Sequence, residues 1–244
     1  MRKILLVMLA LLVAVGVSLP SLAQDSEMGH LRFAHFSPAA PTVTVFLNGE
    51  IRYSGLRFQS ITRWAEVEPG TYEIAVGTGS AIEDAVITGT VEVTAGGYVT
   101  AAAIGNNSPM IASVNESFAD IPEGNARVTI LHAAEGISPV DILANGSPVV
   151  TLLAYPGTVI NPDGLNDGIA TLDVPAGTYD LAVAVNGTST PVIDLSGTTL
   201  EAGMSYLVAA VGTAPNDDGS LGTPIAVVAA TDPASFVPEE EEVD

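Results

Sequence analysis

The stretch from His35 to Gly49, HFSPAAPTVTVFLNG, indicates the fold of this chain. Val43, Val45 and Leu47 place apolar side chains at every second position, and the pair Asn48-Gly49 follows directly. Alternation of this kind is typical of a strand with one buried face, and Asn-Gly tolerates the positive φ angles of a tight hairpin turn. We therefore expect a half-buried strand that enters a hairpin at Asn48-Gly49.

A second copy of this pattern runs from His132 to Gly146, HAAEGISPVDILANG. The offset between the copies is 97 residues at the histidines (132 − 35) and 107 at Tyr72 and Tyr179 (179 − 72). The second copy therefore carries ten extra residues, and the turn-forming segment Asn161–Gly168, NPDGLNDG, is their expected place. Two copies that differ by one loop insertion predict two domains of one fold.

The repeated pattern resembles the domain of unknown function 4397 family, which occurs in secreted and surface proteins of bacteria. In the first copy the resemblance rests on Arg32–Pro41, Val43–Gly49 and Pro69–Tyr72. In the second copy it rests on Arg127, His132, Ser138-Pro139, Asn145-Gly146 and Gly177–Tyr179. The second copy departs from the pattern after its histidine, where Ala133–Gly136 replaces the Ser-Pro run. The resemblance implies an all-β fold of two tandem immunoglobulin-like β-sandwich domains, and no known activity.

The domain organisation follows from these repeats and from the two ends of the chain. We expect a first sandwich at residues 30–117, a linker at 118–125, a second sandwich at 126–232 and an acidic, disordered tail at 233–244. Short strands separated by Gly and Pro turns favour sandwiches over an open sheet, and one continuous strand is expected from Gln59 to Glu66.

The first 23 residues have the features of a secretory signal peptide. Arg2-Lys3 precedes an apolar run, and the small residues of Ser21–Ala23 favour cleavage before Gln24. The alternative is an uncleaved anchor, although the apolar run is short for a membrane span. No later segment is long and apolar enough to span a membrane. We expect a secreted protein that is extracellular or associated with the cell envelope.

The composition excludes several classes of function. A net charge of −21 repels nucleic acid and anionic lipid, although it attracts divalent cations. The chain has no cysteine, so disulfides, thiol catalysis and cysteine metal sites are excluded.

His35 and Ser37 are the first candidates for catalysis, as a base and a nucleophile. Ser37 precedes a proline and lacks a nucleophile elbow, so a turn-capping role is the stronger interpretation. His35 and the equivalent His132 have no cysteine or carboxylate nearby at metal-ligand spacing, so we expect each to hydrogen-bond the loop behind its strand. No catalytic residue is predicted.

Two acidic loops are weak candidates for Ca²⁺ binding, because hard cations prefer several oxygen ligands from one loop. The candidate ligands are Asp163 and Asp167 in one loop and Asp217 and Asp218 in the other. Neither loop fits the EF-hand spacing, and plain turns are the favoured alternative. No other cofactor is expected.

Trp64 and Arg63 are weak candidates for ligand binding. A surface Trp beside Arg can stack on a sugar or on a partner side chain, whereas a buried Trp belongs to the core. Alternation leaves the burial of Trp64 undecided, and we favour the core.

The sequence therefore predicts an exported, non-enzymatic structural or interaction module that resembles adhesion proteins in its design. Its partner would be a protein or a glycan at the cell envelope, met by sandwich-end loops or exposed strand edges. A carbohydrate-binding or Ca²⁺-dependent module is the first alternative, and a hydrolase is the weaker one.

Overall fold

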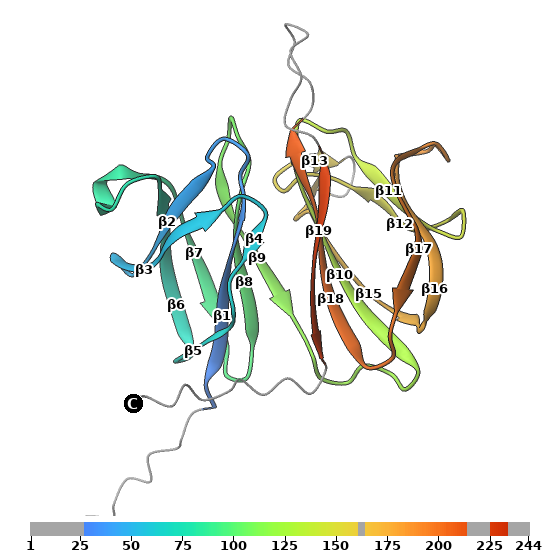
Figure 1. The fold of residues 1–244 in the computed structure, drawn as a ribbon, viewed down its shortest axis with the longest axis horizontal. Helices are drawn as coiled ribbons and strands as arrows, with labels where there is room; N and C mark the ends of the chain where they lie inside the picture. The colour runs from blue at the N-terminus through green and yellow to red at the C-terminus, as the bar shows by residue number, and fades with distance from the viewer. Residues whose placement is uncertain (1–26, 161–163, 214–224, 234–244) are drawn as a thin grey trace, which may run out of the picture.

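The computed structural model describes residues 27–160, 164–213 and 225–233, and these residues form an all-β structure with one short 3₁₀ turn (Figure 1). The predicted signal peptide, Asp163, Asp217, Asp218 and residues 234–244 of the predicted tail lie outside the described residues. Within the described ranges, no helix has the length and apolar character needed to cross a membrane.

The first half of the chain forms two sheets. The first inner sheet consists of β4 (Ser60–Ile61) and β5 (Ala65–Val67), which both pair with β1 (Gly29–Phe36), followed by β8 (Tyr98–Ile104) and β9 (Met110–Glu116). The first outer sheet has the order β3 (Glu50–Arg57), β2 (Thr42–Leu47), β6 (Gly70–Gly77), β7 (Ala85–Val93). The 3₁₀ turn η1 (Ile82–Asp84) connects β6 to β7.

The second half repeats this arrangement. The second inner sheet has the order β15 (Ile169–Pro175), β10 (Asn125–Glu135), β18 (Met204–Thr213), β19 (Ala226–Pro233). The second outer sheet has the order β12 (Ser147–Leu153), β11 (Val140–Ala144), β16 (Gly177–Val185), β17 (Pro191–Leu200). In both halves the first strand pairs in parallel with the strand that follows the outer sheet: β1 with β8, and β10 with β18.

The predicted hairpins are confirmed in both copies. Asn48 and Gly49 have φ angles of 50° and 86° between β2 and β3, and Asn145-Gly146 repeats these positive values between β11 and β12. The Asn48 side-chain oxygen also accepts a hydrogen bond from the Glu73 amide at 2.9 Å. This contact ties the turn to β6, so Asn48 stabilises the outer sheet as well as the hairpin.

Each half encloses its own apolar core between an inner and an outer sheet, which makes each half a two-layer sandwich. In the first half, Leu31 and Phe33 of β1 pack against Val45 of β2 and Ile74 of β6. In the second half, the corresponding core unites residues of β10, β11, β16 and β17. These inward faces account for the alternation in the sequence.

A third apolar core joins the two inner sheets face to face, so the molecule has four sheet layers (Figure 1). The buried members of this core come from β1, β8, β9, β10 and β18: Ala34, Phe36, Ala102, Ile104, Ala112, Val114, Leu131, Ala133, Leu207, Ala209 and Val211. Many of them are alanines, whose small side chains allow two sheets to approach closely. We call this set the interface core.

Hydrogen bonds and an ion pair stabilise both ends of the interface core. The Glu135 carboxylate accepts hydrogen bonds from the backbone amides of Asn106, Asn107 (2.8 Å) and Ser108 (3.0 Å), which form the turn between β8 and β9. Toward the other end, the Arg127 guanidinium donates to the Ala119 carbonyl at 2.9 Å and makes a bidentate pair with Asp173. The connection between the halves is therefore held to β10 by hydrogen bonds.

The structure differs from the predicted strand at Gln59–Glu66. Two short strands, β4 and β5, replace it, and Thr62 lies in the gap between them. The Thr62 hydroxyl accepts a hydrogen bond from the Phe33 amide at 3.0 Å, while its own amide donates to the Phe33 carbonyl at 2.9 Å. A side chain thus takes the place of one backbone ladder bond, which interrupts the strand.

The strand registers also place the extra residues of the second copy. The hairpin of β13 (Val159–Ile160) and β14 (Gly164–Leu165) lies between β12 and β15, where the first half passes directly from β3 to β4.

Arg127 does not occupy the position of Arg32 in the repeat. It lies five residues before His132, and the strand registers place it at the position of His30. The apparent match of Arg127 to Arg32 was therefore wrong by two residues.

Candidate functional site

His35 and Ser37 each bond to a backbone carbonyl, and neither bonds to the other. The His35 Nε2 donates to the Ala40 carbonyl at 2.8 Å, across the turn between β1 and β2. The Ser37 hydroxyl donates to the Gly105 carbonyl at 2.5 Å and is buried. Both side chains therefore hold loops at one end of the first sandwich, as the sequence predicted.

His132 occupies the equivalent position in the second sandwich but has a different environment. Its side chain is buried, and neither ring nitrogen makes a hydrogen bond to any described residue. Burial lowers the pKa of His132, and the nearby Ser138 carbonyl opposes this shift without meeting the geometry of a hydrogen bond. The predicted bond from His132 to its loop is therefore missing.

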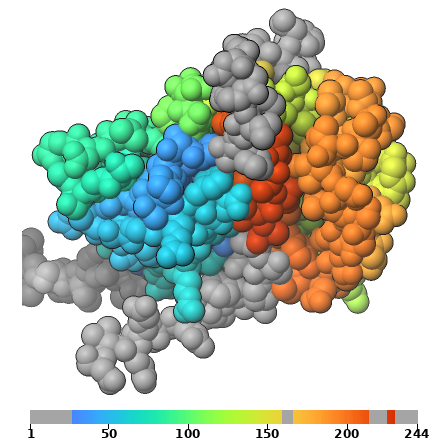
Figure 2. All heavy atoms as spheres, turned by 45° about the horizontal axis from the view of Figure 1, so that its top comes forward, coloured from blue at the N-terminus to red at the C-terminus, as the bar shows by residue number. Residues whose placement is uncertain are grey.

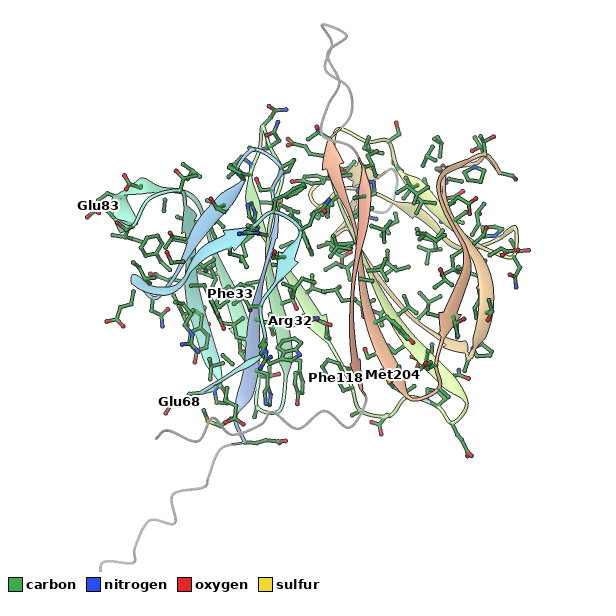
Figure 3. All side chains as sticks on the ribbon, viewed as in Figure 1. Arg32, Phe33, Glu68, Glu83, Phe118 and Met204 are labelled. Atoms are coloured by element: carbon green, nitrogen blue, oxygen red, sulfur yellow. The ribbon has the colours of Figure 1, made fainter. Side chains whose placement is uncertain are left out.

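Trp64 is half-buried in the gap between β4 and β5, and three side chains already contact it. The Arg32 guanidinium lies 4.2 Å from the centre of the indole ring, and Tyr98 and Phe118 meet the ring edge to face. Arg63, the predicted neighbour, points to solvent. Figure 3 shows Arg32 and Phe118 on the side of the first inner sheet that faces the second half. Trp64 thus packs against the start of the connection between the halves.

A buried ionic cluster lies beside Trp64, and the sequence analysis missed it. The Arg32 guanidinium makes two hydrogen bonds to the Glu116 carboxylate, at 2.9 and 3.0 Å, and a third to the Thr100 hydroxyl at 2.8 Å. Thr100 in turn donates to Glu116. The three residues come from β1, β8 and β9 and link these strands across one face. The available signal in the sequence was one charged residue at a buried position of each of two strands, Arg32 in β1 and Glu116 in β9.

Asp141 is a second buried carboxylate, and it also holds loops in place. It accepts hydrogen bonds from the Leu152 amide (3.0 Å), the Asn186 side chain (2.7 Å) and the Gly187 amide (2.9 Å). Burial raises its pKa, but these three donors outweigh burial and leave the pKa below its usual value. Leu152 has a φ of 57°, so Asp141 supports a strained position in β12.

One predicted Ca²⁺ ligand can be placed. The Asp167 carboxylate accepts a hydrogen bond from the Ile169 amide at 3.0 Å, which is a contact typical of a turn. Asp163, Asp217 and Asp218 lie outside the described residues. Within the described ranges no three His or acidic residues gather in a way that would hold a metal ion. Ca²⁺ binding therefore stays a prediction.

Among the described residues, five of the eight exposed large apolar side chains lie on the edge strands of the two outer sheets; the others are Met28, Ile82 and Val185. The five occur on β3, β7, β12 and β17: Ile51, Val86, Val149, Leu152 and Val192. Val86 is the most open of them, at 69% exposure, and Ile51 and Val192 are about half exposed at 50% and 51%. Figure 2 shows one face of the molecule, with surface atoms of both halves coloured by residue number. These edges combine unpaired backbone groups with apolar contacts, and we call them the outer edges.

Three solved structures illustrate what the chain resembles in three dimensions. A carbohydrate-binding module of family CBM26 from Eubacterium rectale, solved with maltoheptaose, is 11% identical with a TM-score of 0.28; the match covers 86% of this chain and 98% of that one. A candidate cell adhesion protein from Bacteroides eggerthii is 13% identical with a TM-score of 0.21, covering 85% and 96%.

A leucine-rich repeat protein from Bacteroides thetaiotaomicron is 14% identical with a TM-score of 0.21. The match covers 80% of this chain but only 27% of that protein. TM-scores of this size establish neither a common ligand nor a common activity. No curated protein matches the chain.

The family match is of a different kind, because it covers most of the chain. The family described as a domain of unknown function (DUF4397) matches residues 29–143 and again residues 126–236. Each match contains one of the two histidine-containing repeats, and the first match extends into β10 and β11, so that the two overlap at residues 126–143. The chain belongs to the DUF4397 family and carries two tandem copies of its domain.

Proposed function

We propose that this protein is an exported, non-enzymatic interaction module of the cell surface or extracellular space. Its partner, a protein or a glycan of the cell envelope, would bind at the outer edges. The observation that carries this proposal is the placement of exposed apolar side chains on the edge strands of both outer sheets.

Edge strands suit this role for a physical reason. Their outward N–H and C=O groups can pair with a strand of another chain, and side chains beside them add contacts that select the partner. Proteins usually protect such edges with charge or proline, and Glu50, Arg52 and Pro191 stand beside Ile51 and Val192 here. The apolar side chains themselves stay exposed and open to a partner. The interface core supports the same proposal, because it fixes the outer sheets on opposite sides of one rigid unit.

The polar groups also fit a binding module better than an enzyme. His35, Ser37 and Asp141 are each committed to a loop or turn by hydrogen bonds. Catalysis needs titratable side chains that converge on a space open to substrate. Broad hydrolase screens of the purified protein should therefore detect no turnover, and reproducible turnover would refute this part of the proposal.

The binding test uses the mature chain as bait against native envelope fractions and chemical cross-linking to locate contacts. Ile51→Lys and Val192→Lys place a charge on one edge of each outer sheet, whereas Thr71→Lys places the same charge on the central strand β6 as a matched control. We expect the edge variants to lose a bound partner that the control retains. Equal retention by all three variants would show that the outer edges are not the binding surface.

A glycan-binding module remains the alternative, with Trp64 and Arg63 as its predicted contacts. It has less support, because Arg32, Tyr98 and Phe118 already occupy much of the space around the indole ring. Binding on a glycan array that disappears in Trp64→Ala and persists in Thr71→Lys would favour this alternative over the outer edges.

We also propose an immunoglobulin-like topology for each half and export by the predicted leader. Tyr72 and Tyr179 support the first point, because each hydroxyl donates to the carbonyl four residues upstream at 2.6 Å, as in the tyrosine corner of such sandwiches. An experimental structure compared strand by strand tests the topology. N-terminal sequencing of exported protein should begin at Gln24, and a retained leader would contradict the second point.

A further inference from the structure

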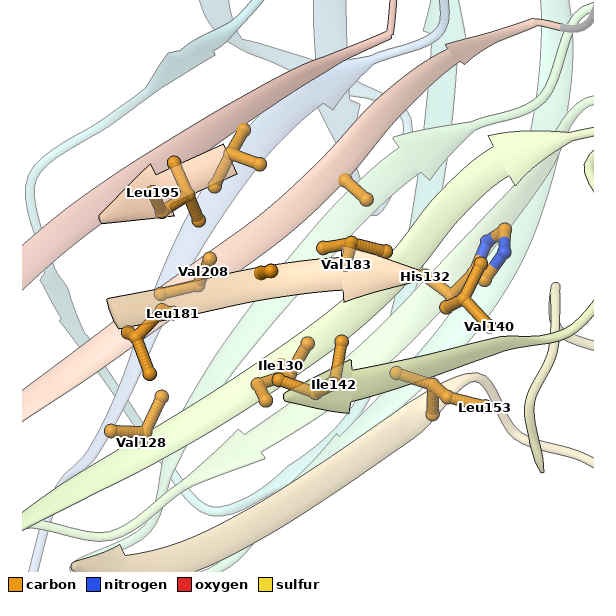
Figure 4. A pocket seen from close by; sticks show the side chains of 13 residues that line it. Val128, Ile130, His132, Val140, Ile142, Leu153, Leu181, Val183, Leu195 and Val208 are labelled. Atoms are coloured by element: carbon orange, nitrogen blue, oxygen red, sulfur yellow. The ribbon is translucent and has the colours of Figure 1, made fainter. Parts of the chain in front are cut away.

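The interior of the second sandwich contains two adjoining apolar cavities of about 50 Å³ each. They share four wall residues from β10, β11 and β16, namely Val128, Ile130, Ile142 and Leu181. Each cavity is several times larger than the roughly 10–15 Å³ that one water needs. His132 lines one end of the first cavity, as Figure 4 shows.

Two substitutions between the repeats explain why space exists here. In the first sandwich, the rings of Phe33 and Tyr53 pack edge to face at 5.6 Å in the core. The strand registers put Ile130 at the position of Phe33 and Val150 at the position of Tyr53. Both aromatic rings are thus replaced by smaller side chains. Val208, at the position of Ala101, restores part of that volume.

The cavities are also less sealed on the side of β17 and β19. In the first sandwich, Ile111 of β9 packs so closely over Gly89 of β7 that a Cβ there would lie 2.9 Å from it. The register places Leu195 near that glycine position in the second sandwich, and β17 comes less close to β19 than β7 does to β9. Val208 and Ala210 point inward but remain half-buried, so the interior communicates with solvent.

His132 gives the cavity one polar feature. Both ring nitrogens are buried, and neither makes a hydrogen bond to a described residue, although the Ser138 carbonyl lies nearby; His35 at the equivalent place bonds to Ala40. A buried polar group without a partner costs free energy, and such groups in native proteins usually have a bound water or ligand. The neutral imidazole, favoured by burial, offers one donor and one acceptor.

We propose that the two adjoining cavities together form a binding site for a small neutral molecule with a short aliphatic body and one carbonyl or hydroxyl group. The aliphatic body contacts Val128, Ile130, Ile142 and Leu195, and the oxygen takes a hydrogen bond from His132. A carboxylate is disfavoured, because a charge in an apolar cavity loses its hydration and the chain already carries −21. The site is independent of the outer edges and of the function proposed there.

The test compares 2-pentanone with n-pentane as probes of the complete mature chain, followed through the NMR signals of the methyl groups that line the cavity. Loss of one hydrogen bond in an apolar site predicts that His132→Leu lowers the affinity for 2-pentanone, relative to that for n-pentane, by about 2- to 10-fold. His132→Leu should leave n-pentane binding in place, because the alkane uses no hydrogen bond. The ratio of the affinities for the two probes remains informative even where the variant changes the stability of the protein.

The double variant Ile130→Phe with Val150→Tyr restores the aromatic pair of the first sandwich and should abolish binding of both probes. The surface variant Thr71→Ala, at an exposed position of β6, is the control and should bind as the unaltered chain does. The proposal is overturned where neither probe shifts the cavity methyl signals at millimolar concentration, where the filled variant binds as well as the control, or where His132→Leu leaves the ratio of the two affinities unchanged.

Discussion

Leu207→Ala should destabilise both sandwiches together, although Leu207 belongs only to the second. Its side chain is 1% exposed and lies in the interface core against the first inner sheet. A buried Leu→Ala change costs about 2–5 kcal/mol, depending on how far the cavity collapses. Because only part of the space can be filled by collapse between the two packed sheets, we expect a loss of about 3 kcal/mol in the free energy of unfolding, near the middle of this range.

The single tryptophan makes this prediction directly measurable. Trp64 lies in the first half, so its fluorescence in urea reports a region that Leu207 does not belong to. With an m-value of about 3 kcal/mol/M, the midpoint should fall by roughly 1 M in the fluorescence and circular dichroism curves alike. Val192→Ala, at an exposed position in the same half as Leu207, should change the free energy of unfolding by less than about 0.5 kcal/mol. Two separate transitions, with the Trp64 midpoint unmoved, would refute the reasoning that the interface core unites the halves.

Three further predictions address polar groups. Burial lowers the pKa of all three histidines of the chain, His30, His35 and His132. Their contribution to the free energy of unfolding is therefore complete above about pH 6.5 and is lost as the pH falls from there toward the folded-state pKa values. The urea midpoint should drop between pH 7.5 and 5.5, and a midpoint that does not change with pH would contradict this. Glu116→Ala should lower the free energy of unfolding by about 3–5 kcal/mol, because it leaves Arg32 buried without its carboxylate. The double variant Arg32→Met with Glu116→Leu should lose much less, and both are measured by thermal and urea unfolding. Equal losses in the single and the double variant would argue against a buried ion pair. Glu135→Ala should cost about 1.5–3 kcal/mol and speed hydrogen exchange at the Asn107 and Ser108 amides, and unchanged exchange would show that the carboxylate does not hold this turn.

Local chemistry made the repeated elements predictable from the sequence. Asn48-Gly49 and Asn145-Gly146 require positive φ angles that few other residue pairs accept, so both hairpins were fixed by their own residues. The insertion was predictable because the spacing between the two repeats is 97 residues at the histidines and 107 at Tyr72 and Tyr179. The ten extra residues must therefore lie between His132 and Tyr179. The interruption at Thr62 was not predictable, because it depends on a side-chain bond to Phe33 across the sheet.

The interface core was the largest feature that the sequence analysis did not predict. Ala34 and Phe36 lie on the opposite face of β1 from Leu31 and Phe33, so this strand is apolar on both sides. Such a pattern indicates a strand buried on both faces. It does not say what covers the second face, because a helix, a partner chain or another sheet would leave the same signal.

The two repeats show how one framework supports different interiors. Their strand order, registers, hairpins and tyrosine contacts agree, because these depend on backbone geometry and on a few polar side chains. The volume of the core depends on other positions, and a strand pattern tolerates any apolar residue there. Phe33 and Tyr53 fill the first interior, whereas Ile130 lines both cavities of the second and Val150 packs against the same core, and the alternation that forms the strands is unchanged. Candidate binding sites in such duplicated sandwiches are therefore found by comparing the copies position by position, since neither copy alone shows which core residues are unusually small.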